Sequence, residues 1–113
     1  MRYIGRLVGL LLACLALAAQ AEDQAAWKAL REGRAVLLMR HAQAPGLGDP
    51  AGFRLDDCST QRNLDAAGRR QAQAWGQQLR LQRIERPRLF SSCWCRALET
   101  TRELGLGTVQ PMP

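Results

Sequence analysis

Residues 36–42 read VLLMRHA, and this stretch decides how the rest of the chain is interpreted. Its first four residues are all apolar, a pattern typical of a β-strand that is buried on both faces. The run ends at Arg40 and His41, and the glycines and prolines that follow predict a loop. Open α/β sheets bind ligands at the carboxyl ends of their strands. We therefore expect a strand over about residues 34–39 that carries a guanidinium and the chain's only histidine to a binding edge.

Length and composition describe one small globular domain. The chain has 113 residues, 47% of them hydrophobic, which suits a folded rather than a disordered protein. Its net charge of +6 favours anionic partners. We do not expect a nucleic-acid-binding protein, because aromatic residues make up only 5% of the chain and the arginines of residues 66–83 are expected on solvated faces.

Residues 1–21 have the form of a secretory signal peptide. Arg2 and Arg6 precede an uncharged apolar run over residues 7–18, and residues 19–21 form a small-x-small cleavage site. The apolar run is too short to span a bilayer comfortably. We expect cleavage after Ala21, a mature domain of residues 22–113 without a stable membrane span, and a periplasmic or secreted location. An uncleaved membrane anchor is the alternative.

Export leaves three cysteines in the mature chain, Cys58, Cys93 and Cys95. In an oxidising compartment, one disulfide and one spare thiol is the simplest outcome. Cys93 and Cys95 are too close in sequence to bridge easily, so Cys58 is expected to pair with one of them, and we favour Cys95. A zinc site is the alternative, but the chain lacks CxxC spacing and a second set of ligands. We expect no metal and no other cofactor.

The rest of the chain alternates helices with strands, which predicts an α/β fold with parallel strands. Asp65 is a good N-cap for a helix that follows it. A loop over residues 42–64 is long for a small domain, and loops of this length are usually functional. The expected elements are helices over 23–31, 66–82 and 96–104, a strand over 88–92, and the start of a further strand at 108–109.

Two parallel strands would bring Arg40 and His41 to the same sheet edge as Ser91, Ser92 and Arg96. Guanidinium groups bind phosphate oxygens through charge-assisted and often bidentate contacts. Arg96 lies near the start of a predicted helix, whose N-terminus also attracts anions. A neutral imidazole among such cations is suited to nucleophilic attack on phosphorus. The pattern therefore indicates a site for phosphoryl groups.

Three blocks of the chain resemble the histidine phosphatase superfamily, also called phosphoglycerate mutase-like proteins, and its small exported members in particular. The blocks are VLLMRHA at 36–42, RNLDAAGRRQAQAWG at 62–76 and FSSCWCRALETT at 90–101. The resemblance implies a three-layer α/β fold with a mostly parallel sheet. It also implies a phosphatase that acts on a small phosphate monoester through a phosphohistidine.

The resemblance implies a role for four residues of this chain. His41 matches the nucleophile, Arg40 and Arg96 match the catalytic arginines that bind the phosphate, and Arg62 matches a further phosphate-binding position. The family also uses a second histidine from a later strand, and usually an acidic residue, and nothing in this chain matches either. We therefore expect a domain that is incomplete at its C-terminus and impaired in activity. A catalytically inactive protein that binds phosphorylated ligands is the alternative, and no residue indicates the substrate or the oligomeric state.

Overall fold

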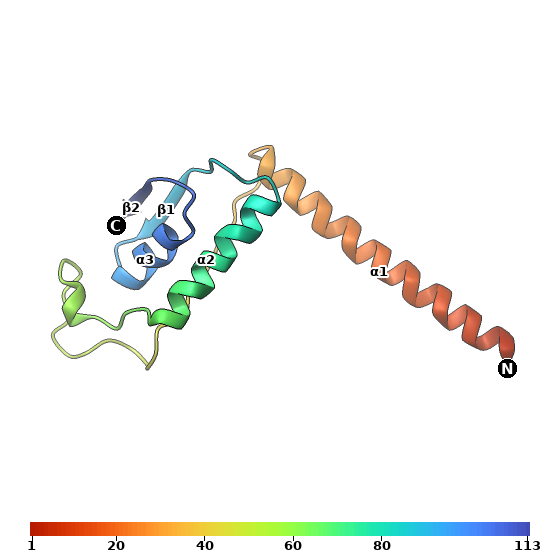
Figure 1. Ribbon diagram of the computed structural model, residues 1–113, viewed down its shortest axis with the longest axis horizontal. Helices are drawn as coiled ribbons and strands as arrows, with labels where there is room; N and C mark the ends of the chain where they lie inside the picture. The colour runs from red at the N-terminus through yellow and green to blue at the C-terminus, as the bar shows by residue number, and fades with distance from the viewer. The chain divides into compact units, whose positions relative to one another are not determined.

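A computed structural model describes the backbone of residues 1–113 and every side chain except that of Arg2. The chain divides into two compact units, residues 1–37 and residues 38–113. The first unit consists of helix α1 (Arg2–Arg31) and the short segment that follows it (Figure 1). The second unit contains the other helices and both strands.

Helix α1 is one uninterrupted helix of 30 residues. It corrects the short helix expected over residues 23–31, because the backbone runs through Asp23 without a break and the N-cap is Met1. The alanines and leucines around that position are strong helix formers and explain the continuity. By length and composition, residues 3–31 are sufficient to cross a membrane, and a signal sequence passes the same test. The apolar N-terminal helix is thus compatible with the predicted signal peptide.

The strand predicted over residues 34–39 does not form. The chain has no regular secondary structure from residue 35 to residue 45, and Val36 and Leu38 are 87% and 88% exposed. The interpretation of this run as a strand buried on both faces was therefore wrong. Such a strand needs hydrogen-bonding neighbours and a covering layer on each face. The sheet in the described residues has two strands, which pair with each other and not with this segment.

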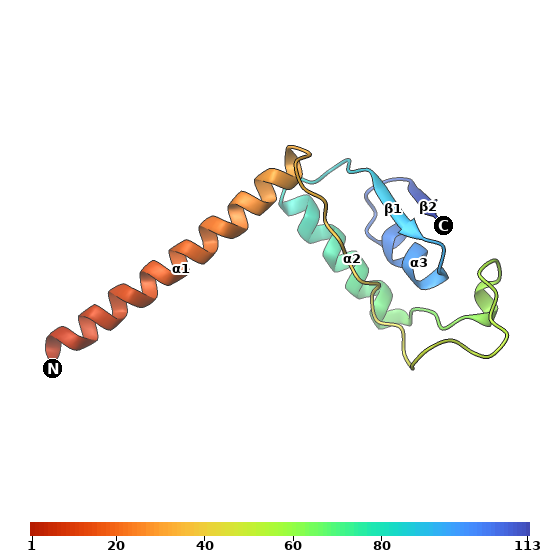
Figure 2. The same cartoon turned by 180° about the vertical axis from the view of Figure 1, so that it is seen from behind.

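The second unit is a mixed α/β structure with a parallel two-stranded sheet. Strand β1 (Leu89–Ser92) pairs in parallel with β2 (Val109–Met112), so that Leu89 lies opposite Val109 and Ser92 opposite Met112. Helix α3 (Cys95–Glu103) connects the two strands and packs against both of them and against α2 (Ala66–Leu81) (Figures 1 and 2). The α/β class and the parallel pairing are confirmed, and the three-layer arrangement stays a prediction.

Helix α2 begins where the sequence predicts. The Asp65 carboxylate Oδ1 accepts a hydrogen bond of 2.7 Å from the backbone N–H of Gly68, which is an N-cap contact. Gly68 and Gly76 lie on the packed face of the helix. A Cβ atom at Gly68 would overlap the carbonyl of Gln43, and one at Gly76 would overlap the carbonyl of Leu104. Both glycines therefore allow other backbone segments to approach the helix closely.

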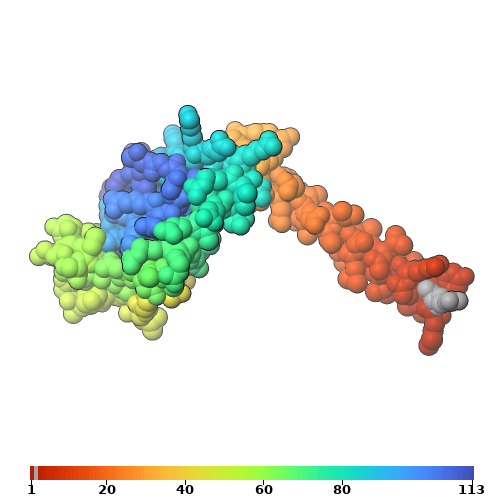
Figure 3. Space-filling model, viewed as in Figure 1, coloured from red at the N-terminus to blue at the C-terminus, as the bar shows by residue number. Residues whose placement is uncertain are grey.

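The predicted loop over residues 42–64 is present and carries one short 3₁₀ helix, η1 (Cys58–Thr60). Its two ends supply most of a small buried cluster, formed by Ala42, Ala44 and Leu64 with Ala72 of α2. In the space-filling view the loop residues form a continuous surface with the start of α2 (Figure 3). The loop is thus attached to the domain at both ends.

Candidate functional site

His41 is half-buried, and its ring has a defined hydrogen bond. Nδ1 lies 2.7 Å from the carbonyl oxygen of Ala42. A carbonyl can only accept a hydrogen bond, so Nδ1 carries the proton in this contact. In the neutral ring the lone pair is then on Nε2, and Nε2 is the atom able to act as a nucleophile.

The residue after His41 is tied to helix α3. The backbone N–H of Ala42 donates a hydrogen bond of 2.9 Å to the Thr100 hydroxyl, and this hydroxyl donates one of 2.7 Å to the carbonyl of Arg96. Ala42 is 1% exposed and Thr100 is 4% exposed, so both bonds are shielded from water. One side chain therefore links the histidine segment to the turn of α3 that begins at Arg96.

Arg96, the second residue of α3, is held from two directions. Its Nη1 donates hydrogen bonds to both carboxylate oxygens of Asp49, at 3.0 and 3.2 Å. The guanidinium carbon lies 4.6 Å from the centre of the Trp94 ring, which is within cation–π distance. Only 13% of the Arg96 side chain is exposed.

Arg62 is joined to the same carboxylate through its backbone. Its N–H donates a hydrogen bond of 2.9 Å to Oδ1 of Asp49. The Arg62 guanidinium binds the loop, with Nε donating to the carbonyl of Gly48 at 2.7 Å and Nη1 donating to the carbonyl of Ala44. In this structure Arg62 braces the loop with two of its three guanidinium nitrogens.

Arg40 is exposed and lies outside this cluster of contacts. Within the part of the chain that the structure describes, its side chain forms neither an ion pair nor a hydrogen bond. Arg62 and Arg96 meet at one carboxylate, and the residue after His41 is bonded to the helix of Arg96. The structure does not connect Arg40 to these groups.

Asp49 is the residue that the sequence analysis missed. The backbone N–H of Arg62 and the guanidinium of Arg96 hold the pKa of the Asp49 carboxyl below its usual value, against the opposing effect of burial. The only sequence signal was an aspartate between Gly48 and Pro50, in the long loop after the Arg-His pair. An aspartate between a glycine and a proline is common in turns, so this pattern alone does not indicate a buried ion pair.

A disulfide attaches the same loop to the start of α3. It joins Cys58 to Cys95, the pair that the sequence favoured, with the two Cα atoms 5.7 Å apart. The backbone N–H of Cys95 also donates a hydrogen bond of 3.0 Å to Oε1 of Gln61, which is buried. Cys93 is a free thiol. Across the described residues, no group of three or more His, Cys, Asp or Glu side chains has the arrangement of a metal site.

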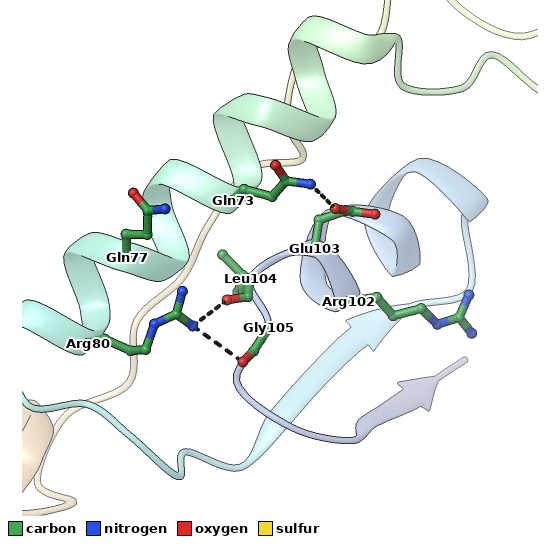
Figure 4. A pocket seen from close by; sticks show the side chains of 7 residues that line it. All are labelled: Gln73, Gln77, Arg80, Arg102, Glu103, Leu104 and Gly105. Carbon is green, nitrogen blue, oxygen red and sulfur yellow. Dashed lines mark hydrogen bonds between the residues drawn. The ribbon is translucent and has the colours of Figure 1, made fainter.

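A separate hollow of about 480 Å³ opens between α2 and the end of α3 (Figure 4). Arg80 donates to the carbonyls of Leu104 and Gly105 at 3.2 and 3.3 Å, and Gln73 donates to Glu103 at 2.6 Å. These polar groups already join the two helices, and we assign no ligand to the hollow. The residues that line it are Gln73, Gln77, Arg80, Arg102, Glu103, Leu104 and Gly105, and none of them is a predicted site residue.

The second unit thus carries a histidine with a hydrogen-bonded ring and two arginines that share one carboxylate. In a comparison with family models, residues 36–112 match the model of the histidine phosphatase superfamily, branch 1. The match covers more than half of the chain, and the chain belongs to the histidine phosphatase superfamily. Corresponding searches of curated proteins and of solved structures find no match.

Proposed function

We propose that the protein is a phosphohistidine-dependent phosphatase that acts on small phosphate monoesters. Membership of the histidine phosphatase superfamily supports the class of reaction. The observation that carries the assignment of His41 is its 2.7 Å hydrogen bond from Nδ1 to the carbonyl of Ala42. This bond fixes the ring orientation and leaves the Nε2 lone pair for attack on phosphorus.

The proposed reaction has two steps. In the first, Nε2 of His41 forms a bond to phosphorus while the bond from phosphorus to the ester oxygen breaks, and the alcohol leaves with a proton from solvent. In the second, water attacks phosphorus, the bond to Nε2 breaks and inorganic phosphate is released. Arg96, with Arg40 and Arg62, would stabilise the negative charge on the phosphoryl oxygens in both steps.

The test is to incubate the protein with p-nitrophenyl phosphate labelled in its phosphoryl group. This ester suits a chain with no assigned general acid, because its leaving group departs without protonation. We expect an adduct that is labile in acid and stable in base, as a phosphoramidate is, and that is absent in His41→Gln. The matched control is Ser91→Ala, since the Ser91 hydroxyl is occupied by a 2.9 Å hydrogen bond to the carbonyl of Ser92.

Two results would change this proposal. An adduct that survives acid, or that persists in His41→Gln, would place the phosphoryl group on another residue. Binding of inorganic phosphate without any adduct would favour the alternative, a catalytically inactive protein that binds phosphorylated ligands. We also propose export to the periplasm or the exterior, on the basis of the apolar N-terminal helix. The intact mass of the exported protein should then show that residues 1–21 have been removed.

A further inference from the structure

The Asp49 carboxylate joins the backbone of Arg62 to the guanidinium of Arg96. Its Oδ1 accepts hydrogen bonds from the backbone N–H of Arg62 at 2.9 Å and from Nη1 of Arg96 at 3.0 Å. The side chains of Asp49 and Arg96 are only 8% and 13% exposed. A charge covered to this extent is tolerated when it is paired and hydrogen-bonded, and both partners meet that requirement.

The ion pair with Asp49 uses one of the three guanidinium nitrogens of Arg96. Within the described part of the chain, Nη1 is the only atom of this group that makes hydrogen bonds. Nε and Nη2 lie along one edge of the same plane, and two parallel N–H donors of this kind suit bidentate contact with phosphate. The Trp94 ring covers one face of the guanidinium and is itself packed against Phe53, with 4.9 Å between the ring centres.

We propose that Asp49 is a positioning residue for phosphoryl binding, which fixes Arg96 so that Nε and Nη2 face a phosphate held beside His41. The inference rests on the proposed function and adds a residue to it. Asp49 is not a proton donor in this role. Both of its oxygens accept hydrogen bonds, and its lowered pKa keeps the carboxylate ionised at neutral pH.

A positioning role and a simple charge effect predict opposite results when Asp49 is replaced. If only its charge mattered, removing a carboxylate beside an anion site would strengthen anion binding. If Asp49 fixes Arg96, its removal leaves a mobile side chain that the ligand must order, and anion binding weakens. The direction of the change in phosphate affinity therefore separates the two explanations.

The experiment compares the full chain with Asp49→Asn and Asp49→Glu. Inorganic phosphate is titrated by calorimetry, and the order of Arg96 is read from the relaxation of its Nε–Hε resonance without ligand. We expect Asp49→Asn to bind phosphate about tenfold more weakly and to release the Arg96 side chain. Asp49→Glu keeps the charge but displaces the carboxylate by one methylene, so its affinity should fall between those of the other two proteins.

The matched control is Asp56→Asn, which removes the same charge from the same loop. The Asp56 side chain is 86% exposed and lies 3.6 Å from Arg54 in a surface ion pair, so phosphate binding should not change. Unchanged or tighter binding by Asp49→Asn, with Arg96 still ordered, would overturn the inference. If Asp49→Asn does not fold, Asp49→Glu decides the question, and affinity equal to that of the unmodified protein would overturn the inference.

Failure of the proposed function gives a different result. In that case the unmodified protein forms no adduct on His41, whereas the order of Arg96 is measured without substrate and still responds to the replacement of Asp49. Conversely, an adduct on His41 together with an Arg96 that is equally ordered in all variants would retain the phosphatase and remove Asp49 from the site.

Discussion

The hydroxyl of Thr100 links the backbone of Ala42, the residue after His41, to the carbonyl of Arg96, and we predict the effect of removing this link. In Thr100→Val the side chain keeps its shape, so no cavity is created. The backbone N–H of Ala42, in a residue that is 1% exposed, loses its 2.9 Å acceptor. An unsatisfied buried donor costs about 1–3 kcal/mol of folding free energy.

Thr101→Val is the matched control for this measurement. The Thr101 hydroxyl donates to the carbonyl of Ala97 at 2.9 Å, as that of Thr100 donates to the carbonyl of Arg96 at 2.7 Å. Both variants therefore lose one hydrogen bond within α3, and only Thr100→Val also loses the contact with Ala42. The difference between the two isolates the link between the histidine segment and the helix.

Urea denaturation followed by circular dichroism gives the free energies of unfolding. We expect Thr100→Val to be less stable than Thr101→Val by about 1–3 kcal/mol, or about 4–8 °C in Tm for each kcal/mol in a domain of this size. Phosphate should also bind more weakly to Thr100→Val, because the histidine segment is no longer fixed to the turn of Arg96. Equal losses of stability in the two variants would refute the reasoning.

Three further outcomes are expected. Gly76→Ala should lose about 1–3 kcal/mol through overpacking against the Leu104 carbonyl, instead of gaining about 1 kcal/mol of helix propensity, as thermal unfolding would measure. Reducing the Cys58–Cys95 disulfide, with a separation of 37 residues, should cost about 3–4 kcal/mol in denaturation with and without reductant. The pKa of Asp49 is lowered, so the stability from its ion pair should be complete above about pH 4 and be lost as the pH falls through the lowered pKa. Denaturation of the unmodified protein and Asp49→Asn across this range tests the pH dependence.

Each of these outcomes has a control in the same part of the chain. Gln77→Ala changes an exposed neighbour of Gly76 and should be neutral or slightly stabilising. Cys93→Ser removes the free thiol nearest in sequence to the disulfide and should leave the response to reductant unchanged. Asp56→Asn keeps the Asp49–Arg96 ion pair, so it should lose stability through the acidic range as the unmodified protein does. The first prediction is contradicted if Gly76→Ala is as stable as the unmodified protein, and the second if reductant does not change the free energy of unfolding. The third is contradicted if the stability difference between the unmodified protein and Asp49→Asn stays constant through the acidic range.

Local sequence signals predicted the second unit well. Asp65 indicated the start of α2 because N-capping depends on the residue itself and on the backbone a few residues away. The strand after Pro87 and the helix that follows it were located to within about one residue, since both have short apolar patterns bounded by breakers. The strand expected over residues 34–39 was wrong, because pairing depends on neighbouring strands that the sequence of the segment itself does not specify.

The sequence indicated candidate residues for the site but not the contacts between them. The order of an Arg-His pair and a later Arg96 is visible in the sequence, whereas the carboxylate that joins Arg62 to Arg96 is separated from them by 13 and 47 positions. Sequence patterns at helix or strand spacing do not report contacts over such distances. Asp49 was therefore missed for the same reason that the strand was wrongly predicted, since both depend on long-range pairing.

The two outcomes together explain how the site is assembled in this chain. The sequence argument required two paired strands to bring the histidine and the later arginine to one edge, and one of those strands is absent. The groups are instead tied to the first turns of α3 by three contacts of different chemistry: the Thr100 hydrogen bonds, the Asp49 ion pair and the Cys58–Cys95 disulfide. All three act on the same short segment, so their contributions should be coupled rather than additive. Removing one of these contacts should therefore change the factor by which removing another lowers phosphate affinity. A double-mutant cycle on Thr100 and Asp49 would measure this coupling.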